Sequence, residues 1–204
     1  MNSQEEQIRK ERFQLLLQQM LIPGDITDQY FKDGKINKLQ IYKDTKEWRF
    51  VFELNQLLPA TVYQVFSERI VQAFQHIAQV TFTIQYASIP MTEAVLEDYW
   101  KLLVERLRKV SNGFIPVLEN QLPKLHNRQI IIQVRNEAEK EAMLRKLAEP
   151  LKDACLEIGL PPLQLDAEVK ESKEEMERFL EEREKEDHSK VVQAMLEVKK
   201  AEKE

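Results

Sequence analysis

The side-chain types that bind metals or act as nucleophiles are sparse in this sequence. The three histidines, His76, His126 and His188, are far apart, and none has the HExxH spacing that places two imidazoles on one helix face. The single cysteine, Cys155, belongs to no cysteine–histidine motif and is interpreted as a small buried apolar residue on a helix. The sequence therefore predicts neither a metal site nor a cysteine nucleophile.

The sequence also lacks the residues that phosphate binding and acid–base catalysis need. The sequence has no GxSxG motif, and its four glycines lie at expected element boundaries and form no phosphate-binding loop. Most carboxylates lie in runs such as Glu181-Glu182, which are typical of solvated helix faces. Asp98 is the one acid in an aromatic setting, and we interpret it as a surface residue. The sequence thus predicts no catalytic residue, no cofactor-binding residue and no metal ligand.

Contacts to another macromolecule are the remaining kind of chemistry, and two groups of residues are candidates. Tyr99 and Trp100 are neighbours on a predicted helix, where adjacent side chains point in different directions. We therefore expect one of them to lie at the surface or at a contact between domains, where aromatic side chains often anchor an interface. Lys43, Lys46 and nearby Arg49 form a cationic hairpin turn that suits an acidic partner, although an ordinary solvated turn has the same composition.

Hydrophobic patterns place these candidates in a first predicted domain of residues 1–88 and a second of residues 89–170. In the first domain, Trp48, Phe50 and Phe52 alternate with Arg49, Val51 and Glu53, which indicates a strand with one buried face. The other expected elements are helices over 4–20, over 28–32 and from Pro59 to Ile77, and strands over 36–42 and 80–86. Their order along the chain is α-α-β-β-α-β.

The second predicted domain repeats this order. A β-branched strand over 129–134 follows a polar turn and precedes a long helix that Gly159 caps. Pro150 is expected to kink that helix or to start a new turn in it. The full set is helices over 92–110, 115–120 and 137–158, and strands over 122–125, 129–134 and 163–169. The predicted fold class is α+β with two three-stranded sheets.

Residues 171–204 differ in composition from the preceding chain. They contain no proline or glycine, and they carry i,i+4 pairs of opposite charge such as Glu181 with Lys185. Two apolar patches, near Phe179 and near Met195, are separated by a very polar stretch. We expect a long charged helix that serves as a linker to a further domain.

Composition and charge restrict the class of protein. The chain has 204 residues, of which 43% are hydrophobic and 32% are charged, so it can bury a core. Its net charge is −5, and the segment from Glu168 onward holds nine Lys or Arg against thirteen Asp or Glu. A nearly neutral body with an acidic tail matches a phosphate backbone poorly, so little or no direct nucleic-acid binding is expected. The absence of a long apolar run or an export signal, together with the single cysteine, predicts a cytoplasmic protein with no membrane contact.

The α-α-β-β-α-β order resembles that of K-homology-like folds. Members of that family hold single-stranded nucleic acid with a GxxG loop between two helices. The glycines of this chain lack that spacing, since they occur at Gly24, Gly34, Gly113 and Gly159. We expect a K-homology-like domain without this loop to bind protein.

Several uncommon strings, in the same order and at the same spacing, resemble the N-terminal region of the PolC-type DNA polymerase III alpha subunit of Gram-positive bacteria (Firmicutes). They are QLLLQQ, KDTKEWRFVFELNQLLP, FQHIAQVTFTI, LEDYW and PKLHNRQIIIQVRNEAE. The resemblance covers essentially the whole chain and implies a fragment of a replicative polymerase that extends DNA with Mg²⁺ and removes mispaired 3′ ends. The acidic clusters of such two-metal chemistry do not occur in this sequence, so the resemblance gives it no catalytic residue and no cofactor.

The first predicted domain also resembles the alpha-binding domain of the clamp-loader tau subunit and the N-terminal domain of the initiator DnaA. Both are interaction domains, so the resemblance implies that the chain tethers replisome proteins at the nucleoid, such as tau, a helicase, a primase or an initiator-type partner. We expect the contacts to involve Lys43, Lys46, Arg49, Tyr99 and Trp100. No small-molecule substrate is expected. The alternative is a sequence-independent module that binds single-stranded DNA or primer–template, and an isolated enzyme is the third possibility.

Overall fold

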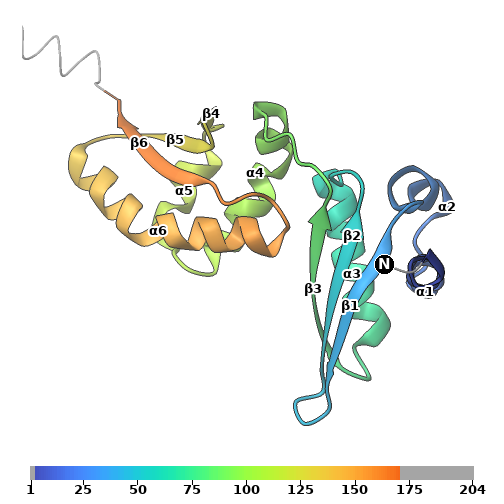
Figure 1. Cartoon of the computed structure of the whole chain (residues 1–204). Helices are drawn as coiled ribbons and strands as arrows, with labels where there is room; N and C mark the ends of the chain where they lie inside the picture. The colour runs from blue at the N-terminus through green and yellow to red at the C-terminus, as the bar shows by residue number, and fades with distance from the viewer. Residues whose placement is uncertain (1–2, 171–204) are drawn as a thin grey trace, which may run out of the picture.

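The computed structural model describes residues 3–170, which form two three-stranded sheets with helices packed against them (Figure 1). The N-terminal unit consists of α1 (Ser3–Gln19), α2 (Gly24–Ile26), the π-helical turn Thr27–Phe31, β1 (Lys35–Tyr42), β2 (Glu47–Leu54), α3 (Ala60–Phe74) and β3 (Gln79–Tyr86). The C-terminal unit consists of α4 (Glu93–Arg108), the 3-10 turn Asn112–Phe114, α5 (Ile115–Glu119), β4 (Lys124–His126), β5 (Gln129–Val134), α6 (Glu137–Glu157) and β6 (Gln164–Val169). Both units have the predicted α-α-β-β-α-β order, and the mixed α+β class is confirmed.

The boundaries of some elements differ from the predicted ones. The second helical segment begins at Gly24 rather than at residue 28, because the extended backbone of Pro23 (ψ 141°) already marks its N-cap. The strand expected over 122–125 starts two residues later, at Lys124. Pro150 lies inside α6, which covers nearly the whole range expected for that helix. The charged helix expected over 171–204 lies outside the described residues.

Each sheet combines one antiparallel and one parallel pair of strands. β1 runs antiparallel to β2, and β2 runs parallel to β3; the second sheet repeats this arrangement with β4, β5 and β6. Parallel neighbours need a crossover, which α3 provides in the first sheet and α6 in the second. Strand alternation buries one face, so Phe50, Phe52 and Leu54 of β2 are at most 3% exposed.

Aromatic side chains fill the space between α1, α3 and the first sheet. The rings of Phe31, Phe52 and Phe66 surround Phe13, with centroids 6.0, 5.4 and 6.5 Å from it. Gly34 lies where a Cβ atom would be 2.3 Å from a carbon of the Phe13 ring, so a larger residue does not fit at the start of β1. The N-terminal unit is thus built around Phe13.

The C-terminal unit has an aliphatic core and capped helices. α6 packs against β6 and α4, and it buries Met143, Leu147 and Leu151. Thr92 accepts a hydrogen bond of 3.3 Å from Val95 N–H and so caps the N-terminus of α4. Within residues 3–170 no helix, including the 21-residue α6, combines the length and apolar composition needed to cross a membrane.

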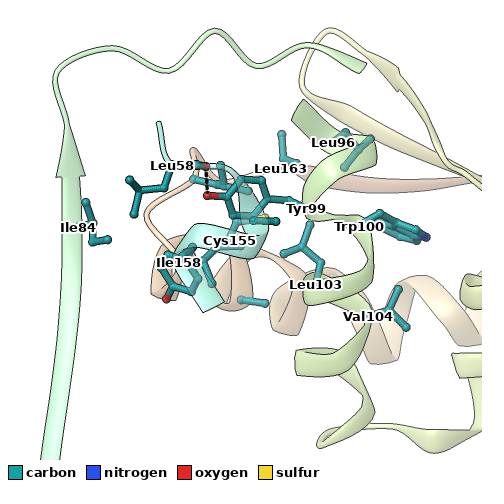
Figure 2. Packing of buried hydrophobic residues seen from close by; sticks show 14 of the residues in the cluster. Leu58, Ile84, Leu96, Tyr99, Trp100, Leu103, Val104, Cys155, Ile158 and Leu163 are labelled. Carbon is teal, nitrogen blue, oxygen red and sulfur yellow. Dashed lines mark hydrogen bonds between the residues drawn. The ribbon is translucent and has the colours of Figure 1, made fainter. Parts of the chain in front are cut away.

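The two units share buried side chains at their junction (Figure 2). Leu58 and Ile84 of the N-terminal unit belong to the same buried cluster as Tyr99 and Ile158 of the C-terminal unit. The sheets are separate, yet the apolar surface between them is common to both units. The expected domains of residues 1–88, 89–170 and 171–204 therefore stay a prediction.

Candidate interaction surfaces

The cationic hairpin turn is exposed and tied to the sheet. Tyr42 and Glu47 are the last paired residues of β1 and β2, and the four residues between them make the turn. Lys46 adopts a left-handed conformation (φ 53°), and its carbonyl oxygen accepts a 2.8 Å hydrogen bond from Gln79 N–H at the start of β3. Lys43 and Lys46 are exposed, and within residues 3–170 neither forms an ion pair with a carboxylate.

Arg49 differs from the two lysines because its charge is already paired. Its Nε atom lies 2.7 Å from a Glu47 carboxylate oxygen, and its guanidinium carbon lies 4.9 Å from the centroid of the Tyr42 ring. The hydrogen bond between the two side chains lowers the pKa of Glu47 and raises the pKa of Arg49. The Arg49 side chain is still 52% exposed, so it can contact a partner protein without breaking its ion pair with Glu47.

Tyr99 and Trp100 are both buried, and Tyr99 is the one that lies at the contact between the two units, so neither is at the surface. Tyr99 is 0% exposed, and its hydroxyl donates a 2.6 Å hydrogen bond to the carbonyl oxygen of Leu58 in the N-terminal unit (Figure 2). Trp100 is 4% exposed, and its indole N–H donates to the carbonyl oxygen of Leu118 at 3.0 Å. Both side chains fit inside because α4 is covered by α3 on one side and by α5 on another.

The five candidate residues therefore do not form one surface. Lys43, Lys46 and Arg49 lie at the β1–β2 turn, at the end of the N-terminal unit remote from α4 (Figure 1). Tyr99 lies at the junction of the units, and Trp100 lies in the core of the C-terminal unit. Both side chains are inaccessible in the packed structure: separation of the units would uncover Tyr99, whereas Trp100 would stay buried against α5. The exposed turn is the part that a partner can reach.

Asp98 makes a contact that the sequence analysis missed. Its carboxylate accepts a 2.8 Å hydrogen bond from the backbone N–H of Ala60, the first residue of α3. Pro59 is the N-cap residue of α3 and has no side-chain acceptor, so an acid from α4 caps this helix instead. Asp98 is exposed, as expected, but it links the two units. The available signal was a proline at a capping position, which leaves the first N–H groups of the helix in need of an outside acceptor.

A second polar contact lies beside the junction. Arg106 of α4 lies 2.6 Å from the carboxylate of Glu157, and the Tyr63 hydroxyl of α3 lies 3.5 Å from the Glu157 carbonyl oxygen. Burial raises the pKa of Tyr63 to about 12, so this hydroxyl stays protonated at neutral pH. The Glu157 side chain is 60% exposed, so its ion pair adds little stability but marks one wall of the surface next to β3.

Potentially reactive groups are dispersed in the described part of the chain. Residues 3–170 contain no set of three or more histidine, cysteine, aspartate or glutamate side chains placed to hold a metal ion. Cys155 is 0% exposed, and burial raises the pKa of its thiol to about 11. Because the thiolate is the reactive form, this cysteine is a poor nucleophile at neutral pH.

Two family models match the chain, one in each half. The family model described as "DNA polymerase III polC-type N-terminus I" matches residues 12–84, and the one described as "DNA polymerase III polC-type N-terminus II" matches residues 98–204. The chain belongs to the PolC-type DNA polymerase III family. The first PolC match falls within the N-terminal unit, and the second begins inside α4 at Asp98.

Curated PolC relatives align with almost the whole chain. The chain is 48% identical over 200 residues to DNA polymerase III PolC-type of Halalkalibacterium halodurans, an alignment that covers 98% of this chain and 14% of that protein. The corresponding protein of Bacillus subtilis is 35% identical over 197 residues (97% of this chain, 14% of that protein). That of Bacillus cereus is 36% identical over 192 residues (94% and 13%). The chain thus spans about 14% of the length of these relatives. No solved structure matches it.

Proposed function

We propose that this chain is a non-catalytic interaction module of a PolC-type replicative DNA polymerase. In this proposal, the remaining length of the polymerase carries out DNA-templated DNA synthesis and 3′-to-5′ proofreading with Mg²⁺, whereas this chain uses no cofactor. The observation that carries the proposal is the exposed turn with Lys43 and Lys46, whose charges are unpaired within residues 3–170, in a chain that matches the N-terminal region of the family.

The physical advantage of such a module is an increase in local concentration. A partner held by one part of a polypeptide meets the other parts at an effective concentration that the linker sets. Candidate partners are replisome proteins in the cytoplasm, such as the clamp-loader tau subunit, a helicase, a primase or an initiator-type protein. Exposed lysines favour an acidic surface on that partner, because complementary charge speeds association and selects the partner.

The fold is the finer part of the proposal. The α-α-β-β-α-β order of both units supports a K-homology-like assignment. Two of the glycines have packing roles, since a Cβ at Gly34 would meet Phe13 and a Cβ at Gly159 would meet the carbonyl oxygen of Ile84. None of the four glycines, at positions 24, 34, 113 and 159, has another glycine three residues away, so neither unit has the GxxG loop that clamps nucleic acid, which favours protein as the ligand of both units.

Charge reversal at the turn tests the proposal. Purified tau, helicase, primase and DnaA are injected one at a time over the immobilised chain, and the Kd is measured by surface plasmon resonance. We expect Lys43→Glu with Lys46→Glu to weaken at least one of these partners about tenfold, because rim charges act on association and affinity. Lys101→Glu with Lys109→Glu is the control, since both lysines are exposed on or just after α4 and the change in net charge is equal. Unchanged affinity of the turn variant for every partner would exclude the turn as the contact.

Binding of single-stranded DNA is the competing function. The same two lysines would then meet phosphates, and the affinity for an oligothymidine would fall steeply between low and physiological salt. Strong oligothymidine binding that disappears in the turn variant, without any protein partner, would favour the nucleic-acid module over the tether.

A further inference from the structure

β3 is an edge strand that lacks the usual protection of such strands. It lies at one end of the strand order β1-β2-β3, and its sequence QVTFTIQY contains no charge, no proline and no glycine. All eight of its residues stay in register with β2. Soluble proteins normally prevent an edge from pairing with another chain by charges, prolines, bulges or covering segments. The β3 sequence therefore leaves its edge competent for pairing.

The opposite edge of the same sheet does have these protections. β1 begins at Lys35, carries Lys38, and shifts its register between Ile36 and Lys38. Lys35 also pairs with Glu6 of α1 at 3.5 Å and with Glu53 of β2 at 2.9 Å, so α1 covers the start of this strand. The contrast within one sheet indicates that β3 is left open selectively.

The open edge presents backbone groups at Val80 and Phe82. Gln79 directs its N–H toward β2, where it donates to the Lys46 carbonyl oxygen, and the direction alternates along a parallel ladder. The even-numbered residues of β3 therefore direct both N–H and C=O away from the sheet. Within residues 3–170 neither Val80 nor Phe82 makes a backbone hydrogen bond outside the ladder.

The C-terminal unit covers only the far end of this edge. Gly159, just after α6, has φ 81°, and a Cβ there would lie 2.5 Å from the carbonyl oxygen of Ile84. That carbonyl is one of the outward-directed groups, so Gly159 lies directly against it. The part that no other segment of residues 3–170 covers runs from Gln79 to Thr83, about 16 Å of strand at roughly 3.3 Å per residue.

A trough accompanies the uncovered part of β3. One hollow, with a volume of about 440 Å³, lies between α3 and β3 and ends at Arg106 and Glu157. A second hollow, of about 600 Å³, continues it past Val71 and Val80, which line both, and reaches Lys46. Val71 is 47% exposed and makes the middle of the trough apolar, while Lys46 makes one end cationic.

We propose that an extended segment of a partner protein binds here as a fourth strand beside Gln79–Thr83. Val80 and Phe82 supply the main-chain hydrogen bonds, which are the source of affinity when a peptide adds to a sheet edge. Every second side chain of the segment enters the trough next to Val71 and is therefore small or aliphatic. A carboxylate of the segment pairs with Lys46. This inference rests on the proposed interaction function and names the form of the partner.

Substitution of Val80 isolates the main-chain contribution. Val80→Pro removes an N–H that is not part of the ladder to β2, and edge strands tolerate proline at such positions. Val80→Ala is the matched control, because it also removes the valine side chain but keeps the N–H. Twelve-residue peptides displayed on phage are selected on the 204-residue chain and synthesised, and fluorescence anisotropy gives their Kd for each variant. We expect binding to weaken about tenfold or more in Val80→Pro and only a few-fold in Val80→Ala.

A second variant leaves β3 unchanged. Val71→Glu places a carboxylate in the trough from an exposed position of α3, and we expect it to weaken the same peptides about tenfold, since a charge opposes entry of an aliphatic side chain. Hydrogen exchange gives an independent signal, because the amides of Val80 and Phe82 are expected to exchange more slowly when peptide is bound. Thermal melting of every variant confirms that it is folded.

Four outcomes would overturn the proposal. They are the selection of no binding peptide, equal peptide affinity in Val80→Pro and Val80→Ala, oligothymidine binding that Val80→Pro removes, and self-association of the chain that Val80→Pro removes. The variant Lys43→Glu separates this question from the broader one, because Lys43 belongs to the turn and not to the trough. If Lys43→Glu weakens a replisome partner while the edge variants have no effect, the interaction function stands and only the strand addition is wrong.

Discussion

At the residue scale, Asp98 shows how one side chain connects the two units. Its carboxylate accepts from the Ala60 N–H at the positive end of α3. We predict that Asp98→Ala lowers the free energy of unfolding by about 0.5–2 kcal/mol, because the first N–H group of α3 loses the one side-chain acceptor that residues 3–170 provide. Urea unfolding followed by circular dichroism measures the change, and Glu97→Ala is the control for an exposed acid of α4. Equal effects of the two substitutions would contradict the capping role.

Cys155 gives a prediction about pH at the same scale. Burial raises the pKa of its thiol from 9.0 to about 11, so the folded state holds this proton more tightly than the unfolded state. The resulting contribution to stability is complete below pH 9 and is lost as the pH rises through 11. We predict that the unfolding free energy falls more steeply between these pH values in the wild type than in Cys155→Ala, as measured by urea titrations. Parallel pH profiles of the two proteins would show that the thiol does not contribute.

At the scale of elements, Gly159→Ala tests how the end of α6 meets β3. The substitution forces an L-residue to φ 81° and places its Cβ 2.5 Å from the Ile84 carbonyl oxygen. We predict a loss of about 1–3 kcal/mol in unfolding free energy, visible as a lower melting temperature. Gly113→Ala is the control, because a Cβ there meets no atom of the described chain within 4 Å. A melting temperature of Gly159→Ala equal to that of the control would mean that α6 and β3 are not in this contact.

Local patterns predicted the elements well and their buried faces less well. Strand alternation identified β2 and β3, because Phe50 and Phe52 need only one covered face. The helices expected to reach Ile77 and Val110 end earlier, at Phe74 and Arg108, and Ile77 and Val110 are 59% and 60% exposed. Trp100 is buried because α4 has neighbouring elements on two sides. The spacing of apolar residues along one helix does not show how many other elements pack against it.

The candidate surface was predictable to the extent that it is local. The exposure of Lys43 and Lys46 followed from a polar stretch between two alternating runs. The cap from Asp98 to Ala60 joins residues 38 positions apart, and Gly159 meets a strand in the other unit. Such contacts depend on how the units pack, which no local pattern of this sequence encodes.

At the scale of the whole molecule, the buried cluster determines whether the two units act as one body. Leu58, Ile84, Tyr99 and Ile158 bring apolar surface from both units into one set (Figure 2). Burial of apolar surface is the main favourable term in folding, so sharing it couples the stability of one unit to that of the other. We therefore expect the two sheets to unfold in a single transition, although they share no strand.

Tyr99→Phe tests this coupling. The substitution removes the hydroxyl that donates to the Leu58 carbonyl oxygen, and a buried acceptor left without a donor lowers stability by about 1–3 kcal/mol. In a urea titration followed by NMR, signals of Ile70 and Ile132 report on the two units. We predict that both disappear at one urea concentration in the wild type and at one lower concentration in Tyr99→Phe.

Tyr42→Phe is the matched control, because the Tyr42 side chain is 39% exposed. We expect the signals of both units to disappear at the same urea concentration in Tyr42→Phe as in the wild type. A shift of the Ile132 signal alone, or two transitions in the wild type, would show that the units are independent domains. Independent units would also change the binding surface. Gly159 would then no longer be held against Ile84, and the open edge of β3 would extend beyond Thr83. The cooperativity of unfolding and the length of peptide that the edge accepts are thus two measurements of the same contact.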